Sequence, residues 1–286
     1  MNGKQILLTG ASNGIGLAAA EALVALGANV AIVGRNETRT RIAAARVKVA
    51  RRRGATVDTF TADLSSQAAV RKLAAEVLDR YPRVDVLINN AGAMYTTRQV
   101  TNDGIELTWA VNHLAPFLLT TLLLDRLKAS TPSRIITTSS EAHQGADIPF
   151  DNLKAEKSYG GFARYKQTKL ANVLFTSELA RRLEGSGVSA HCFHPGLVAS
   201  GFNRNNGLLM NLAMLALGPM SRSAEKGAET LVWLATSANV VKTNGGYYVD
   251  KEWRRPSPQG QDVQAARRLW EISEAQCAGR SAEVRL

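Results

Sequence analysis

Short apolar runs alternate with longer amphipathic stretches along the whole chain. Between the runs, stretches such as 16–27 and 66–81 carry apolar residues at the helical spacing of three and four positions. The runs themselves are nearly continuous in apolar residues, so we expect strands that are buried on both faces, as in a parallel sheet. The alternation of strand and helix predicts an α/β fold with a doubly wound parallel sheet in three α/β/α layers. The predicted strands cover residues 5–9, 29–34, 56–60, 84–89, 134–139, 188–193 and 245–249.

The 286 residues are predicted to form a single domain, 1–286. This length suits one large domain or two small ones, but no linker rich in Pro, Gly or Ser divides the chain. The stretch 254–262 is predicted to be a loop, which leads into a C-terminal helix at 262–278.

Positive charge is concentrated in one stretch, 35–53, which holds eight Lys or Arg residues and one Glu. The whole chain has a formal net charge of +11. We interpret most of the stretch as the solvated face of a helix, with Arg51, Arg52 and Arg53 favourably placed at its C-terminal end. Nucleic-acid binding is the alternative. The stretch lacks interleaved aromatic residues and a recognised motif, so no nucleic-acid partner is predicted.

Cysteine content and hydropathy indicate a cytoplasmic protein. Only Cys192 and Cys277 occur, which excludes a disulfide framework and a zinc-ligand spacing. The apolar run at the N-terminus is too short for a signal peptide. No window approaches the roughly 20 apolar residues of a membrane span, and the nearest approach, 207–218, contains Asn211. We therefore expect no integral membrane span, while a peripheral membrane contact and a homo-oligomer both stay open.

A glycine-rich turn follows the first predicted strand and opens the first helix. Its sequence, LLTGASNGIG (7–16), places Gly10, Gly14 and Gly16 in the spacing G-x-x-x-G-x-G. Glycine has no Cβ, so the backbone can approach a pyrophosphate at the positive end of a helix. The pattern in this context indicates a dinucleotide site, with a plain tight turn as the alternative.

The end of the second predicted strand bears on the choice of cofactor. Sites for NAD usually place an acidic residue there, which binds the ribose 2′-hydroxyl. Here the chain has Gly34 and Arg35 instead. A guanidinium can bind a 2′-phosphate through charge-assisted hydrogen bonds, whereas a carboxylate would repel it. The sequence therefore favours NADP(H) over NAD(H).

The stretch YKQTK (165–169) lies within a predicted helix and brings a tyrosine and a lysine onto one face. An isolated pair of this kind is ordinarily two surface residues. The ordinary pKa of a tyrosine is about 10, and a fixed cation one helical turn away would favour the phenolate. Tyr165 and Lys169 are therefore candidates for acid/base chemistry near neutral pH.

Six motifs occur in an order and spacing that resemble the short-chain dehydrogenase/reductases. They are TGASNGIG (9–16), NNAG (89–92), VNHLAPF (111–117), TSS (138–140), YKQTK and HPGLVAS (194–200), and the resemblance covers residues 4 to about 250. The long gap between Ser140 and Tyr165, the stretch 169–196 and the tail RRLWEISE (267–274) resemble the retinol dehydrogenase and WW-domain oxidoreductase branch. The resemblance implies a Rossmann fold and an NADP(H)-dependent enzyme that interconverts an alcohol and an aldehyde or ketone.

The resemblance also implies roles for four catalytic residues. Tyr165 would be the catalytic acid/base, and Lys169 would bind the nicotinamide ribose and lower the pKa of Tyr165. Ser140 would hold the substrate oxygen. Asn112 would complete a proton relay through water.

The cofactor-binding positions follow from the same resemblance. Asp63 matches the residue that contacts adenine, and Val198 and Ser200 would meet the nicotinamide carboxamide. The remaining positions, together with Tyr165 and Lys169, are Gly10, Ser12, Asn13, Gly14, Ile15, Gly16, Arg35, Leu64, Asn90, Ala91, Gly92, Pro195 and Gly196.

The chain departs from the family pattern at three points. Ser200 stands where many members have Thr, which preserves a hydroxyl. Asn13 stands where many NADP-preferring members have Lys or Arg, so the cofactor preference depends more on Arg35. Membrane-bound retinol dehydrogenases carry an N-terminal anchor that is not expected here, which weighs against a retinoid substrate.

The segment 201–223, after the PG motif, covers the active site in proteins that this chain resembles. Gly201 and the pair Gly218 and Pro219 suit the ends of a hinged lid, and the residues between them are apolar on almost every side. As a lid, the segment favours a bulky apolar substrate such as a retinoid, a steroid or a long-chain carbonyl compound. A helix packed on the domain or on a subunit partner, and a loose membrane contact, are the alternatives.

Other residues with chemical potential are assigned structural roles. The histidines at 143, 191 and 194 do not form a metal cluster, Cys192 is expected in the core, and the tryptophans at 109, 233 and 270 are expected to pack helices. No metal site is predicted. The alternative function is a non-catalytic NADP-binding sensor or interaction protein, but such proteins typically lose the tyrosine or the lysine.

Overall fold

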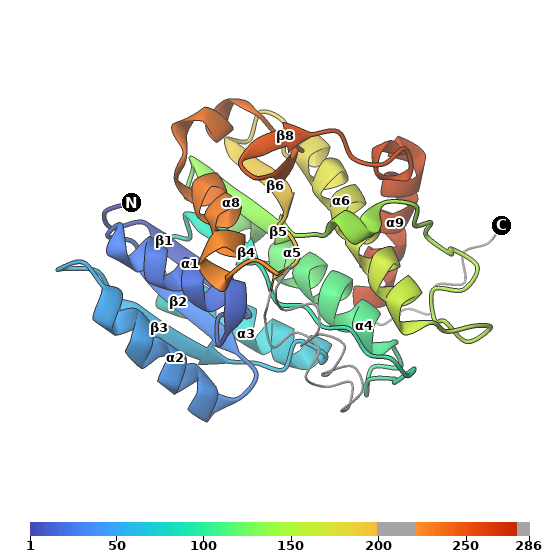
Figure 1. The fold of residues 1–286 in the computed structure, drawn as a ribbon, viewed down its shortest axis with the longest axis horizontal. Coiled ribbons are helices and arrows are strands. Elements are labelled where there is room, and N and C mark those ends of the chain that lie inside the picture. The colour runs from blue at the N-terminus through green and yellow to red at the C-terminus, as the bar shows by residue number, and fades with distance from the viewer. Residues whose placement is uncertain (199–220, 279–286) are drawn as a thin grey trace.

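Eight strands form one sheet in the computed structural model, which describes residues 1–198 and 221–278 (Figure 1). The strands are β1 (Gln5–Thr9), β2 (Asn29–Gly34), β3 (Val57–Thr61), β4 (Val86–Asn89), β5 (Ser133–Thr138), β6 (Val188–His194), β7 (Tyr247–Val249) and β8 (Glu252–Arg254). The helices are α1 (Gly14–Ala25), α2 (Glu37–Ala50), α3 (Gln67–Arg80), α4 (Leu107–Trp109), α5 (Ala115–Ala129), α6 (Gly161–Arg182), α8 (Ala224–Thr236) and α9 (Val263–Cys277). Shorter helical turns are the π-helix η1 (Ala110–Leu114) and the 3₁₀ turns η2 (Glu141–His143), η5 (Ala238–Lys242) and η6 (Gln259–Gln261).

The strand order is β3-β2-β1-β4-β5-β6-β7-β8, and all neighbours are parallel except β7 and β8. This confirms the predicted doubly wound sheet, with β8 as an antiparallel edge strand that the apolar pattern did not predict. The order reverses direction between β1 and β4, and ligands of such sheets bind at the carboxyl ends of the strands beside this switch point.

Helices cover both faces of the sheet, as the three-layer prediction requires. On one face, α1, α2 and α8 pack on a cluster that includes Leu23, Ile32 and Leu231. On the other face, α3, α5, α6 and α9 pack on a cluster that includes Leu119 and Leu174. Figure 1 shows α1 and α8 side by side in front of the sheet, and α6 beside α9.

One continuous helical stretch, Leu107–Ala129, is long and apolar enough to cross a membrane by length and composition. The expectation that no window comes near the length and hydropathy of a membrane span, with 207–218 as the nearest, was therefore wrong for this stretch. It comprises α4, η1 and α5, and 72% of its most apolar window is buried inside the molecule. Its side chains Trp109, Phe117 and Leu123 belong to the core cluster, which is what the central helix of a folded domain shows.

Several helices begin at residues that cap them. The side chains of Asn36, Ser66 and Asp262 accept backbone N–H groups at the starts of α2, α3 and α9. In contrast, Asn13 precedes α1 without a side-chain capping hydrogen bond, and the first turn of α1 has no acidic residue. The N–H groups at the start of α1 therefore stay directed at the space beyond the carboxyl end of β1.

Candidate active site

The glycine turn after β1 is built so that backbone segments pass very close to one another. Gly10 and Gly14 have φ angles of 68° and 53°, in the left-handed region that favours glycine. A Cβ on Gly10 would lie 2.7 Å from Ala91 Cα, and a Cβ on Gly16 would lie 2.4 Å from Gly10 O. The glycines therefore let the turn pack tightly at the N-terminus of α1, an arrangement that suits the pyrophosphate of a dinucleotide.

Asn90 ties this turn to the neighbouring strands. Its Nδ2 donates to Thr9 O at 3.1 Å and to Gly10 O at 3.2 Å. The backbone N–H groups of Asn90 and Ala91 donate to Thr9 Oγ1 at 3.0 and 3.1 Å, and Thr138 Oγ1 donates to Asn90 Oδ1 at 3.3 Å. The NNAG motif therefore holds the ends of β1, β4 and β5 together.

The end of β2 carries one cation and no carboxylate beside it. Gly34 is buried, and a Cβ there would lie 2.1 Å from Thr40 Oγ1. Arg35 is exposed, and within the part of the chain that the structure describes it makes no ion pair. Its guanidinium can therefore reach an anionic ligand at this edge of the sheet.

Asp63 lies exposed just beyond β3 and holds its own turn. Its Oδ1 accepts the backbone N–H of Ser65 at 3.0 Å and the Ser65 hydroxyl at 2.8 Å. Leu64 is half-buried and packs on the core. Ser12, Ile15 and Gly92 are also half-buried around the glycine turn. Contact between these residues and an adenine or a nicotinamide stays a prediction.

Tyr165, Lys169 and Ser140 come together at the carboxyl end of β5. The Tyr165 side chain is hydrogen-bonded to the Ser140 side chain. Lys169 Nζ lies 5.4 Å from the centroid of the Tyr165 ring and donates to Thr138 O at 3.1 Å. The helical spacing therefore places the cation beside the phenol, as the sequence predicted.

The pKa of Tyr165 is raised in the protein alone, not lowered overall, and the lowering effect expected of Lys169 stays a prediction. Burial raises the pKa of the Tyr165 phenol to about 12, although the hydrogen bond from Ser140 acts in the opposite direction. Burial also lowers the pKa of Lys169 to about 8. Burial is the largest cause of the shift, because it disfavours the charged phenolate. Tyr165 is therefore neutral, and a proton donor, at pH 7.

Asn112 is fully buried in η1, and its side chain joins two parts of the site. Its Oδ1 accepts the N–H of Ala93 at 2.7 Å, and its Nδ2 donates to Ala93 O at 2.8 Å and to Thr168 Oγ1 at 3.0 Å. π-helical turns are frequent at functional sites. The predicted part of Asn112 in a water relay stays a prediction, while its role in linking the loop after β4 to α6 is visible.

The turn after β6 is closely packed against Arg222. Gly196 has a φ angle of 85°, and a Cβ there would lie 2.7 Å from Arg222 Cδ. Val198 is buried and forms a β-bridge with Arg222, while Pro195 is half-buried. The predicted cofactor residue Ser200 and most of the predicted lid, 201–220, lie outside the described residues.

His143 is a neighbour of the site that the sequence did not predict. Its Nδ1 lies 2.8 Å from Ser140 O, and its Nε2 accepts the N–H of Ser257 at 3.2 Å. These contacts require the neutral ring with the proton on Nδ1, and burial lowers the pKa of His143. His143 therefore fastens the loop after β8 to the Ser140 turn. The only signal in the sequence was its place three residues after Ser140.

The residues assigned to packing are found in the core or at its edge. Trp109, Trp270 and Cys192 are buried, and Trp233 is half-buried beside Tyr248. Burial raises the pKa of Cys192 to about 12, so this thiol is not a nucleophile at neutral pH. Among the described residues, no group of three or more His, Cys, Asp or Glu side chains could hold a metal ion.

Comparison with known proteins gives one consistent result. A family model described as short chain dehydrogenase matches residues 4–208. Human retinol dehydrogenase 14 is 40% identical over 289 residues, which covers 96% of this chain and 86% of that protein. A protein assigned as the daunorubicin C-13 ketoreductase DnrU of Streptomyces sp. (strain C5) is 40% identical, with coverage of 96% and 92%.

Solved structures agree with this result. An uncharacterised protein from Mycobacterium Paratuberculosis superposes with a TM-score of 0.79 at 31% identity, covering 98% of this chain and 95% of the other. The Pseudomonas aeruginosa RhlG/NADP active-site complex superposes with a TM-score of 0.69 at 28% identity, covering 86% and 94%.

Proposed function

From the premise that the chain belongs to the short chain dehydrogenase family, in a retinol dehydrogenase-like branch, we propose that it is an NADP(H)-dependent enzyme with Tyr165 as its acid/base. Family membership makes the chain an oxidoreductase of the alcohol and carbonyl type. The cofactor preference, the substrate class and the residue roles are the proposal.

The observation that carries the proposal is the contact of Tyr165 with Ser140 and Lys169 beside the glycine turn. A bound nicotinamide would supply or accept the hydride. Ser140 and Tyr165 would hold the substrate oxygen from two sides, and the neutral phenol would donate the proton that the oxygen needs on reduction. Lys169 would bind the cofactor ribose, and its charge would stabilise the phenolate when the reaction runs toward oxidation.

NADP(H) is favoured by charge at the end of β2. Arg35 is exposed there, and Gly34 leaves no carboxylate to repel a 2′-phosphate. A structural neighbour is a complex with NADP. Gly10, Gly16 and Asn90 support a dinucleotide site because they hold the glycine turn tightly packed at the start of α1.

A bulky apolar substrate is favoured by an exposed aromatic ring near the tyrosine. Phe162 is 62% exposed and stacks on the Tyr165 ring at an interplanar angle of 24° and a centroid distance of 6.5 Å. The names of two relatives specify retinol and daunorubicin, both large ring-containing compounds. The cytoplasm is proposed as the compartment because Cys192 and Cys277 are buried free thiols.

The direct experiment is to follow NADPH oxidation with a panel of aldehydes and ketones, including a series of straight-chain aldehydes. We expect turnover that is faster with NADPH than with NADH, and a kcat/KM that rises with carbon number by up to roughly fourfold per methylene. A protein that binds NADPH tightly and turns over no member of the panel would instead support a non-catalytic sensor. A flat series would argue against the apolar substrate class.

A further inference from the structure

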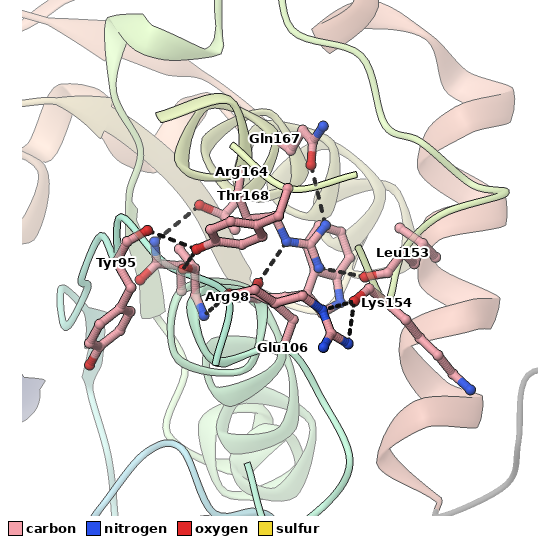
Figure 2. Close-up of polar contacts among 12 residues, drawn as sticks. Tyr95, Arg98, Glu106, Leu153, Lys154, Arg164, Gln167 and Thr168 are labelled. Carbon is pink, nitrogen blue, oxygen red and sulfur yellow. Dashed lines mark hydrogen bonds and ion pairs between the residues drawn. The ribbon is translucent and has the colours of Figure 1, made fainter. Parts of the chain in front are cut away.

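A buried ion pair joins α6, which carries Tyr165 and Lys169, to the start of α4, which continues into η1 with Asn112. Arg164 Nε donates to Glu106 Oε2 over 2.7 Å, and the two side chains are 2% and 0% exposed (Figure 2). Glu106 is also the N-cap of α4, because its carboxylate accepts the N–H groups of Thr108 at 2.8 Å and Trp109 at 2.9 Å. Arg164 lies in the first turn of α6, immediately before Tyr165.

The rest of the Arg164 guanidinium is held as well. Nη2 donates to Leu153 O at 2.5 Å, and Nη1 donates to Gln167 Oε1 at 3.3 Å. The Cζ atom lies 4.6 Å from the centroid of the Trp109 ring. The single side chain is therefore fixed by α4, by its own helix and by the loop that precedes α6, as Figure 2 shows.

A second connection runs between the same two elements. Asn112 Nδ2 donates to Thr168 Oγ1 at 3.0 Å, and Thr168 Oγ1 donates to Tyr165 O at 2.7 Å. Asn112 belongs to η1, which directly continues α4. The ion pair and this hydrogen-bonded chain together fix the start of α6 relative to η1.

The loop before α6 is tied to the segment after β4 by further polar contacts. Tyr159 OH donates to Tyr95 O at 2.7 Å, and Arg98 Nη2 donates to Lys154 O at 3.1 Å. Because the contact of Arg98 is exposed, it provides a comparison for the buried pair.

Stability alone is a weak reason for such a pair. Taking two charges out of water is costly, and apolar replacements of buried ion pairs are often equally stable. The planar guanidinium of an arginine does, however, hold its N–H groups in fixed directions, so it selects one arrangement of the two elements that it joins. We propose that the Glu106–Arg164 pair is a positioning device that fixes Tyr165 on α6 relative to Asn112 on η1. Its effect on turnover rests on the proposed function.

The test uses a neutral pair, Glu106→Gln with Arg164→Met, because each single change would leave a buried charge without its partner. The matched control is Arg98→Met, which removes an exposed cation of the same network and leaves α6 untouched. Circular dichroism and thermal melting establish that each variant is folded. Amide hydrogen exchange is read for peptides that cover 107–114 and 161–169, with 5–9 as an internal reference.

For the neutral pair we expect exchange at least about tenfold faster in both peptides and unchanged in the reference. We also expect kcat to fall about 10- to 100-fold, the usual scale for a misplaced catalytic group, with the KM for NADPH within about threefold of the parent value. Arg98→Met should change neither the exchange rates nor kcat. A folded neutral pair whose exchange and kcat both stay within about twofold of the parent protein would overturn the proposal.

Two further outcomes are covered by this design. If the neutral pair does not fold, the second variant is Arg164→Lys, which keeps the charge but loses the hydrogen bond to Leu153 O. This variant should lower kcat at least about threefold and leave the KM for NADPH unchanged. An unchanged kcat in that variant would overturn the proposal. If the parent protein turns over no substrate, the proposed function fails, and the exchange measurement still decides whether the pair positions Tyr165.

Discussion

The proposed preference for NADP(H) rests on Arg35. An aspartate at position 34 would be the usual change toward NAD, but its Cβ would lie 2.1 Å from Thr40 Oγ1, on a side chain that is 1% exposed. The cleaner change is Arg35→Ala. It should lower kcat/KM for NADPH by about 10- to 100-fold, since a hydrogen bond to a charged group contributes about 1.5–3 kcal/mol, and leave kcat/KM for NADH nearly unchanged.

The control for this change is Arg41→Ala on α2, where Arg41 is exposed and pairs with Glu37 at 3.3 Å. Steady-state kinetics with both cofactors measure, for each variant, the ratio of kcat/KM for NADPH to kcat/KM for NADH. If Arg35→Ala lowers kcat/KM equally for NADPH and NADH, or lowers neither, the 2′-phosphate is bound elsewhere, for example by the other arginines of 39–53.

At the residue scale, local motifs were predictable and long-range partners were not. The glycine turn and the Tyr165–Lys169 pair depend on spacing within one turn or one helix, so the sequence shows them directly. His143 and Ser257 are 114 positions apart, and Glu106 and Arg164 are 58 apart. Only the fold brings such residues together. The direction of the Tyr165 pKa also depends on burial, which a sequence motif does not contain.

At the element scale, α9 is expected to be essential for the α6 side of the core. Trp270 is 5% exposed, lies 4.9 Å from the Phe117 ring and 5.9 Å from the Phe175 ring, and is covered by Arg182 at 4.3 Å. Trp270→Ala should lower the free energy of unfolding by about 3–5 kcal/mol, the usual cost of emptying a buried aromatic site. Denaturant titration measures this change.

Trp253 supplies the matched comparison on β8, where it is 60% exposed. Trp253→Ala should change the free energy of unfolding by no more than about 0.5 kcal/mol, as exposed positions usually do. Equal losses in the two variants would contradict the assignment of α9 to the core.

Apolar runs predicted the strands to within about two residues, because central strands such as β1 and β4 are buried along their whole length and are mostly apolar. Strand β8 escaped prediction because Glu252, Trp253 and Arg254 are all exposed, and only backbone pairing with β7 makes them a strand. The π-helical turn η1 was also missed, since it is a local change of hydrogen bonding within the continuous helical stretch Leu107–Ala129 and leaves no period in the sequence.

At the scale of the whole molecule, the four histidines predict sensitivity to acid. Burial lowers the pKa of each, to about 3 for His113 and about 4 for His191. Between these values and the unfolded value of about 6.5, the unfolded chain binds more protons than the folded one. The contribution of these neutral histidines to the free energy of unfolding is therefore fully present above about pH 6.5, and it is lost as the pH falls below that value.

The expected loss between pH 6.5 and pH 5 is about 2 kcal/mol for each of His113 and His191, from about 1.4 kcal/mol per pH unit. Denaturant titrations at several pH values measure it. His191→Phe keeps an aromatic ring beside Tyr248 and removes one titrating group, so its stability should depend less steeply on pH. A free energy of unfolding that stays constant from pH 7 to pH 5 would contradict these pKa values.

The central claim is that this fold places Tyr165 as the proton donor and acceptor of an NADP(H)-dependent carbonyl and alcohol interconversion. The most direct test is the rate of NADPH oxidation by Tyr165→Phe with a carbonyl substrate that the parent protein reduces, measured beside the affinity for NADPH. The account predicts a kcat at least about 100-fold lower, with a dissociation constant for NADPH within about threefold of the parent value. Turnover within about threefold of the parent rate, in a variant that binds NADPH normally, would contradict it.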